Sequence, residues 1–366
     1  MRLYTSILAM LLLCGIGCSE KKKMEKKHHL FVGTYTDGES KVIYKLTFNA
    51  STGELSNKTL AAELDNPSFL KISDDRKNLY AVHEVADFDS LGGGVSAFLV
   101  KDGVLEFQNS RGTSGKHPCH VSLSDNGFLA AANYSGGNFS VFKLNDDGSL
   151  PEHSQVIDHK ILDTSKVAHA HMAQFEDNNL FVADLGLDAV KRYQLDGNMF
   201  GPAKQSSLNM PQGAGPRHFT FGKNGILYVI NELNSTITVF EKKENGDYEE
   251  IQTVETLASD FEGKSYCADI HLSADGKFLY GSNRGENTIV IFSVDENSGL
   301  LNVVGRTSVH GDWPRNFSLD PTGKFLLVAN QRSHNITVYS RNQEQGTLQF
   351  LNEFKMPSPV CLEFLN

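Results

Sequence analysis

The sequence predicts an all-β fold, a seven-bladed β-propeller whose ring is closed by pairing of the C-terminal strand with the N-terminal blade. Three observations support this prediction: a repeat of about 50 residues, four strand-like segments within each repeat, and incomplete repeats at the two ends of the chain. Four short strands in a repeat of this length are typical of a propeller blade.

The repeat is clearest in its last complete copy, which begins at Pro314. A Pro-Arg start, a turn at Thr322-Gly323 and a strand-like segment at 335–339 follow one another there. Earlier copies begin at positions 67, 118, 170, 216 and 268. Apolar and polar residues alternate in every copy, and Phe, Val, Ile and Tyr are frequent, as expected of half-buried strands.

The two ends of the repeat region hold complementary fragments. Residues 29–35 match the second strand of a blade and lack a first, whereas residues 356–364 match a first strand with nothing after it. Together they complete a seventh blade, and their pairing covers two open sheet edges. We therefore expect removal of the C-terminal strand to open the ring.

The N-terminus is predicted to be a separate leader. Residues 1–18 have the pattern of a lipoprotein signal peptide, in which an apolar run ends at Cys18, the expected lipidation site. An ordinary cleaved signal peptide is the alternative, because Gly15 stands where a lipobox usually has Leu. Residues 19–28 form a polar tether and residues 29–366 the propeller. The expected location is the cell envelope, lipid-anchored to a bacterial membrane and facing the periplasm or the surface, with no membrane contact beyond the anchor.

Composition excludes several other kinds of function. The 366 residues carry a formal net charge of −10, which argues against a nucleic-acid partner. Of the five cysteines, three lie outside the leader (Cys119, Cys267 and Cys361), and an odd number argues against a disulfide framework. No cysteine has metal-ligand spacing, and no serine-hydrolase elbow, zinc-protease motif or phosphate loop occurs. We expect neither a metal nor a cofactor.

Ionisable residues gather at one end of the predicted central channel. The first strand of each blade lines the channel, and its start lies on the same face as the end of the second strand. The equivalent position near the start of first strands holds, in successive copies, His120, His171, His218 and Asp269. Arg217 and Arg315 precede this position in two copies, and Glu232 and Arg284 follow or end second strands. Such a mixture exceeds what the fold needs, although a polar, hydrated channel can itself account for His120, His218 or Asp269.

Several of these segments carry a family resemblance. The matching segments are Gly213-Ala-Gly-Pro-Arg-His218, Asn231-Glu-Leu-Asn-Ser235, Ala268-Asp-Ile-His271 and Pro314-Arg315. Over residues 30 to 366 the sequence resembles the lactonase family of seven-bladed propellers, which includes bacterial 6-phosphogluconolactonase and fungal carboxymuconate cyclase. The resemblance implies a lactonase, a carboxylic ester hydrolase whose substrate is a small anionic lactone.

The resemblance also implies roles for individual residues. His171, Arg217, Glu232 and Arg284 are the expected catalytic residues, and His120, His218, Asp269 and Arg315 are expected to bind substrate. The most favoured reaction is hydrolysis of 6-phosphogluconolactone to 6-phosphogluconate, in which water attacks a carbonyl polarised by arginine. Either Glu232 or His171 would be the base, and the sequence does not decide between them.

The predicted export leaves the substrate open. 6-Phosphogluconolactone is a cytoplasmic metabolite, so an exported enzyme would meet a different pool. One alternative is an extracytoplasmic lactonase or cycloisomerase for another anionic lactone. Another is a non-catalytic envelope binding module, for which Tyr35, Tyr134 and Trp313 are the aromatic candidates at the mouth. Three arginines favour an anionic ligand, and the sequence does not indicate the oligomeric state.

Overall fold

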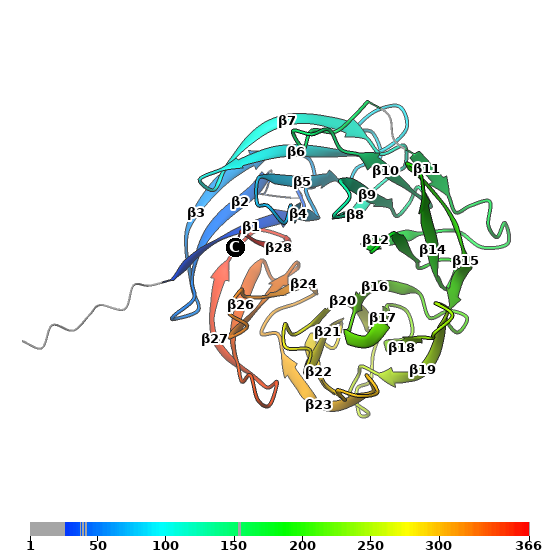
Figure 1. The fold of residues 1–366 in the computed structure, drawn as a ribbon. Coiled ribbons are helices and arrows are strands. Elements are labelled where there is room, and N and C mark those ends of the chain that lie inside the picture. The colour runs from blue at the N-terminus through cyan, green and yellow to red at the C-terminus, as the bar shows by residue number, and fades with distance from the viewer. Residues whose placement is uncertain (1–25, 37, 39, 41, 153–154, 366) are drawn as a thin grey trace, which may run out of the picture.

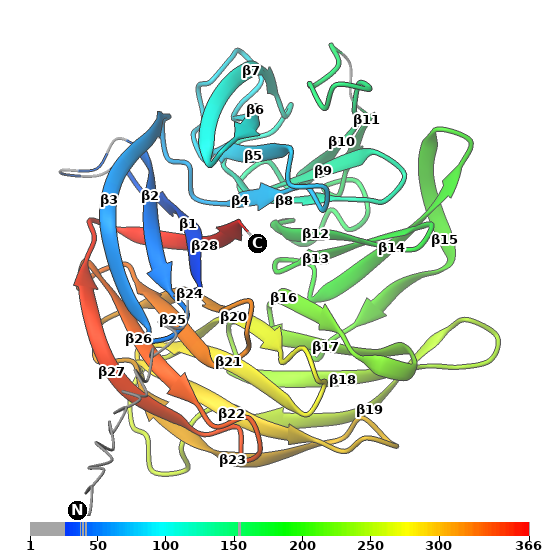
Figure 2. The ribbon, with the colours of Figure 1, turned by 60° about the vertical axis from the view of Figure 1, so that its left-hand side comes forward.

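The computed structural model describes residues 26–365, except residues 37, 39, 41, 153 and 154 (Figure 1). The predicted signal peptide, its Cys18 and most of the tether lie outside the described residues. The described chain forms seven four-stranded antiparallel sheets arranged as blades around a central channel, which confirms the predicted fold class (Figures 1 and 2). The described residues include no helical segment with the length and hydropathy of a membrane span.

Strand order runs outward from the channel in every blade. Blade one contains β28 (Pro359–Leu365), β1 (Lys27–Thr34), β2 (Val42–Asn49) and β3 (Glu54–Glu63). Blade two contains β4 (Leu70–Ile72), β5 (Asn78–His83), β6 (Gly94–Lys101) and β7 (Val104–Gly112). Blade three contains β8 (Pro118–Leu123), β9 (Phe128–Asn133), β10 (Asn138–Lys143) and β11 (Gln155–Asp158). Blade four contains β12 (Ala170–Glu176), β13 (Asn179–Asp184), β14 (Ala189–Asp196) and β15 (Met199–Asn209).

The remaining three blades repeat this plan. Blade five contains β16 (Pro216–Phe221), β17 (Ile226–Asn231), β18 (Thr236–Lys242) and β19 (Tyr248–Glu255), with a short 3-10 turn, η1 (Lys223–Gly225), after β16. Blade six contains β20 (Tyr266–Leu272), β21 (Phe278–Arg284), β22 (Thr288–Val294) and β23 (Leu301–Ser308). Blade seven contains β24 (Pro314–Leu319), β25 (Phe325–Asn330), β26 (Asn335–Arg341) and β27 (Leu348–Lys355).

The ring closes as the terminal fragments predicted. β1 pairs antiparallel with β28, with His29 opposite Leu365 and Val32 opposite Leu362. In Figure 2 the red C-terminal strand lies beside the blue N-terminal strand. Buried side chains of blades one and seven, including Phe364 and Phe325, pack in one core cluster across this closure. The closure therefore rests on ladder hydrogen bonds within blade one and on apolar packing against blade seven.

Neighbouring blades are tied by a repeated hydrogen bond. A tyrosine in the second strand of one blade donates to a glycine carbonyl in a turn of the next: Tyr80 to Gly148 (2.6 Å), Tyr228 to Gly299 (2.8 Å) and Tyr280 to Gly346 (2.8 Å). These glycines have φ between 72° and 80°, where other residues are strained, so the turn needs glycine.

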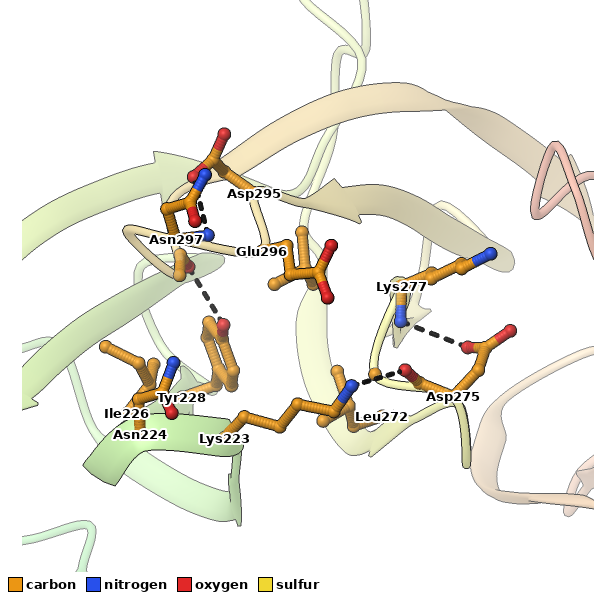
Figure 3. A pocket seen from close by; sticks show the side chains of 13 residues that line it. Lys223, Asn224, Ile226, Tyr228, Leu272, Asp275, Lys277, Asp295, Glu296 and Asn297 are labelled. Atoms are coloured by element: carbon orange, nitrogen blue, oxygen red, sulfur yellow. Dashed lines mark hydrogen bonds between the residues drawn. The ribbon is translucent and has the colours of Figure 1, made fainter.

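Figure 3 shows a cavity of about 110 Å³ beside one of these ties, between blades five and six. Its polar groups bond to one another, with Lys223 Nζ 3.0 Å from the Asp275 carbonyl and the Lys277 amide 3.0 Å from Asp275 Oδ1. This cavity is an inter-blade contact and contains none of the predicted site residues.

Candidate active site

A β-bulge at the start of the first strands determines which side chains face the mouth of the channel. In blade five Pro216 pairs with Asn231 and His218 with Ile230, so Arg217 is the extra residue of the bulge. The same irregularity makes Arg315 the bulged residue of blade seven and His171 that of blade four. Bulges re-aim single side chains and occur often next to active sites. His171 therefore occupies the position of Arg217 and Arg315, one residue from the predicted equivalence with His120.

Three ionisable residues form a continuous network across blades five and six. Glu232 follows β17, and its Oε2 lies 3.1 Å from Arg217 Nε and 2.8 Å from Arg284 Nη2. Arg217 also donates to the Ala268 carbonyl, and Arg284 Nη2 donates to the Cys267 carbonyl at 2.9 Å. Because both guanidinium groups bind carbonyls at the start of β20 as well as one carboxylate, their orientation is fixed.

The third arginine of the mouth pairs more loosely. Arg315 Nη2 lies 3.8 Å from Glu84 Oε2, and its guanidinium carbon lies 5.2 Å from the Tyr35 ring centroid. Tyr35 donates its hydroxyl hydrogen to Glu84, with the hydroxyl oxygen 2.9 Å from Oε2. Among the described residues Arg315 has no side-chain hydrogen bond, so its N–H groups remain available to a ligand.

His171 lies between the mouth and an aromatic wall. Its ring centroid lies 5.5 Å from that of Tyr134 and 5.2 Å from that of His218. Its Nδ1 lies 3.7 Å from the Cys119 thiol. Burial, followed by the nearby charge of Arg217, lowers the pKa of His171 well below its usual value. The imidazole is therefore neutral at pH 7.

The arginines remain charged in spite of burial. Arg217 is 2% exposed, and burial together with Arg284 and Arg315 lowers its pKa to about 10. Three guanidinium groups face the two carboxylates of Glu84 and Glu232 at this mouth, so the site carries one excess positive charge. That excess suits an anionic ligand or an oxyanion.

The wall behind His171 is held by a buried carboxylate. Asp184 Oδ2 lies 2.7 Å from His159 Nδ1, and its Oδ1 accepts the backbone amide of His169 at 2.8 Å. The His169 ring stacks on Tyr134 with centroids 4.5 Å apart and an interplanar angle of 16°. Asp184 thus fixes the turn into β12 and, through it, the backbone that carries His171.

Trp313 completes the rim on the other side. Its ring lies 3.4 Å from the Arg332 guanidinium carbon and 5.2 Å from that of Arg284. Tyr266 lies beside it, with ring centroids 6.1 Å apart. Trp313 therefore holds the Arg332 guanidinium by a cation–π contact and borders Arg284.

His120, His218 and Asp269 lie one layer deeper than the mouth. Asp269 accepts hydrogen bonds from His218 Nδ1 (2.8 Å), His271 Nε2 (2.9 Å) and Asn316 Nδ2 (2.6 Å). His218 remains close to the mouth, because its Nε2 lies 3.4 Å from Arg217 Nη1. The structure therefore places His171, Arg217, Glu232, Arg284 and Arg315 together and places the other three beneath them.

Glu84 was not assigned from the sequence as a site residue, and Tyr35 was considered only as an aromatic candidate of a binding module. Glu84 follows β5 as Glu232 follows β17, and this equivalence was the available signal. Tyr35 follows β1, and its approach to Arg315 depends on blades one, two and seven meeting at the closure. Cys119, Cys267 and Cys361 are free and buried, and no cluster of metal-ligating side chains occurs in the described part of the chain.

Comparisons with known proteins agree with this architecture. A family model described as "Lactonase, 7-bladed beta-propeller" matches residues 29–364. A Bacillus subtilis protein named 6-phosphogluconolactonase is 36% identical over 92% of this chain and 98% of its own length. A second, from Formosa agariphila, is 35% identical over 80% of this chain and 86% of its own.

A solved structure of similar size supports the same assignment. The periplasmic gluconolactonase of Pseudomonas aeruginosa superposes with a TM-score of 0.87 at 33% identity, covering 93% of this chain and 99% of that one. The chain therefore belongs to the lactonase family of seven-bladed β-propellers and is a hydrolase of that class.

Proposed function

We propose that the mouth formed by Arg217, Glu232, Arg284, Arg315 and His171 hydrolyses 6-phosphogluconolactone to 6-phosphogluconate. The observation that carries this proposal is the excess of three buried or half-buried arginines over two carboxylates around one opening. The names of the Bacillus and Formosa relatives support the same substrate. An anionic lactone gains from this charge twice, through its phosphate and through the oxyanion that forms during hydrolysis.

In the proposed reaction water adds to the lactone carbonyl, and the ring C–O bond then breaks. Arg217 and Arg284, fixed by Glu232, hold the carbonyl oxygen and stabilise the charge of the tetrahedral intermediate. Arg315, which has free N–H donors, holds the phosphate. The attacking water loses a proton to the base, and the departing ring oxygen takes up a proton to become a hydroxyl group. The products are a carboxylate and an alcohol in one molecule.

We assign the base to His171. Its imidazole is neutral at pH 7 and can accept a proton, whereas Glu232 Oε2 already faces two guanidinium groups. Replacing Glu232 would release both arginines, because its Oε2 is the carboxylate oxygen that both contact. Glu232 is therefore a positioning residue in this scheme, and its free Oε1 makes it the competing candidate for the base.

Single variants test these roles against spontaneous hydrolysis of the lactone. Arg217→Ala and Arg284→Ala should each lower kcat by about 10²–10³. His171→Asn should lower kcat by about 10²–10⁴ and remove the acidic limb of the kcat/KM profile. Glu232→Gln should lower kcat while keeping that acidic limb, because His171 remains. Loss of the limb in Glu232→Gln and its retention in His171→Asn would assign the base to Glu232.

A second candidate function is favoured by the predicted leader and by the Pseudomonas structure, whose name describes a periplasmic gluconolactonase. In that case the substrate is an unphosphorylated or carboxylated lactone outside the cytoplasm, and the protein is lipid-anchored through Cys18. Comparing kcat/KM for 6-phosphogluconolactone and glucono-1,5-lactone separates the two candidates. Arg315→Met should raise KM for the phosphorylated lactone alone if phosphate binds there.

The lipid anchor has its own test. Cells that express the full chain should incorporate a labelled fatty acid into the protein, and Cys18→Ala should abolish this incorporation. The alternative of a non-catalytic binding module is not favoured, because the chain is a member of an enzyme family. A cycloisomerase would consume no water, and isotope incorporation from H₂¹⁸O into the product distinguishes it from a hydrolase.

A further inference from the structure

A second cavity, of about 390 Å³, lies at the other end of the channel from the arginine mouth. It is lined by residues that follow the bulged positions along the first strands, including His120, Ser122, Gln174 and Thr220. Phe69, His218 and Asn316 line both this cavity and the small hollow at the mouth, so they form the wall between the two. None of Arg217, Glu232, Arg284 and Arg315 lines it.

Two buried polar atoms in this cavity have no partner. His120 Nδ1 and Ser122 Oγ make no hydrogen bond to any described residue, although the two residues are only 5% and 6% exposed. An unsatisfied buried polar atom costs about 1–3 kcal/mol, and nearly all such atoms in native proteins bond to protein, water or a ligand. These two atoms belong to cavity-lining residues two apart on β8, where water or a ligand would have to supply the missing partners.

Most of the charges around the cavity are paired within the protein; the exception is Asp74, an exposed carboxylate that also lines the cavity and has no ion pair among the described residues. The Asp269 carboxylate is saturated by His218, His271 and Asn316, and Lys71 Nζ lies 3.6 Å from Glu363 Oε1. Burial, followed by the proximity of His218, lowers the pKa of His120 well below its usual value, so its imidazole is neutral. An anionic ligand would find no unpaired positive charge here and would lose its hydration.

Apart from Asp74, the groups left to a ligand are neutral and of mixed polarity. Ser122 and Thr220 hydroxyls both donate and accept, the Gln174 amide does so through separate atoms, and neutral His120 has one donor and one acceptor nitrogen. An apolar wall stands beside them, because the Phe69 ring lies over His120 with centroids 4.2 Å apart and an angle of 38°. Hydroxyl groups on a compact carbon skeleton match both features. The volume also falls within the range of about 300–1,000 Å³ that small-molecule sites have.

We propose that this cavity is a second binding site, for a small uncharged polyhydroxylated molecule such as a free hexose or a linear polyol. The site is separate from the lactone site, and it does not depend on the reaction proposed for the mouth. Its ligand differs from the lactone in charge, since the mouth carries excess positive charge and this cavity does not.

Binding of D-glucose to the full-length protein tests the proposal, with D-gluconate as an anionic probe of the same size. Saturation-transfer NMR detects weak binding, and calorimetry gives the dissociation constant. Ser122→Ala removes one partner with little change of volume and should weaken glucose binding about three- to tenfold. His120→Phe keeps the aromatic ring, removes both ring nitrogens and should weaken it further. Arg217→Ala, at the mouth, is the matched control and should leave glucose binding unchanged.

Circular dichroism and melting temperature establish that each variant is folded, and Ser122→Ala is the conservative member of the pair. Glucose binding that is weakened in both cavity variants and kept in Arg217→Ala supports the proposal. Binding that Arg217→Ala abolishes and Ser122→Ala preserves places the sugar at the mouth and overturns it. If glucose at tens of millimolar, a concentration high enough to fill a weak sugar site, gives no transfer signal, the proposal is also overturned. The cavity would then hold only water.

Discussion

Acidification from pH 7.5 to 4.5 should destabilise the propeller, and His218 allows the size of the effect to be worked out. Burial, followed by the neighbouring charge of Arg217, lowers the pKa of His218 from 6.5 to about 4. Between pH 6.5 and about 4, His218 is protonated in the unfolded chain and neutral in the folded chain. The stability that this group contributes is therefore complete above pH 6.5 and is lost as the pH falls toward 4.

The magnitude follows from the two pKa values. With 6.5 in the unfolded state and about 4 in the folded state, His218 alone removes about 2.5 kcal/mol of unfolding free energy between pH 7.5 and 4.5. His120 and His171, whose pKa values are also lowered mainly by burial, act in the same direction. His271 acts in the opposite direction, because its bond to Asp269 raises its pKa despite burial.

Comparison of variants isolates the contribution of His218. Urea unfolding at several pH values should show a pH dependence about 2.5 kcal/mol smaller in His218→Asn than in the wild type. Asn keeps an N–H group near Asp269 Oδ1, which His218 Nδ1 now contacts at 2.8 Å. The exposed His310→Asn is the matched control and should keep the wild-type pH dependence. Equal pH dependence in His218→Asn and the wild type would refute the argument.

Three further outcomes are expected. Deletion of residues 359–366 removes β28, exposes the edge of β1 and should prevent ring closure. A truncated protein that elutes as the wild type does from a size-exclusion column and also keeps the wild-type melting temperature would contradict this. Trp313→Leu removes the stacked face beside Arg284 and should raise KM about three- to tenfold with little change in kcat, as steady-state kinetics would show. Asp184→Asn weakens the buried hydrogen bond to His159 and should lower the unfolding free energy in urea by about 1–3 kcal/mol; a loss below about 0.5 kcal/mol would count against this role.

The architecture could be predicted from sequence because every blade repeats the same local signals. Turn glycines, alternating apolar residues and the unmatched terminal fragments together specify strand order and ring closure, and β1 pairs with β28 as expected. The approximate composition of the mouth followed from the same alignment, since the ends of β17 and β21 and the starts of β16 and β24 meet on one face. Periodic, local signals of this kind can be recognised within a single sequence.

What the sequence could not supply was the register within blade four. Blades three, five and seven begin with proline, whereas Ala170 and Cys267 occupy that place in blades four and six. Without the proline the start of β12 is displaced by one residue in the sequence comparison, so His171 was paired with His120. A slip of one residue in a strand changes which way a side chain points, and the bulge adds to this effect.

The contacts of Glu84 and Tyr35 with Arg315 could not be predicted from the sequence either. Arg315 of blade seven is far in sequence from Tyr35 and Glu84 and meets them only when the ring has closed.

The direction in which β1 runs has a practical consequence for attaching this enzyme to a support. β1 ends at Thr34, next to the Tyr35 of the mouth, and begins at Lys27, seven residues and about 23 Å back along the strand. The chain therefore enters the ring on the face opposite the arginines. A linker attached ahead of Lys27 would therefore join the ring on that underside and leave the arginine mouth on the far side from the support.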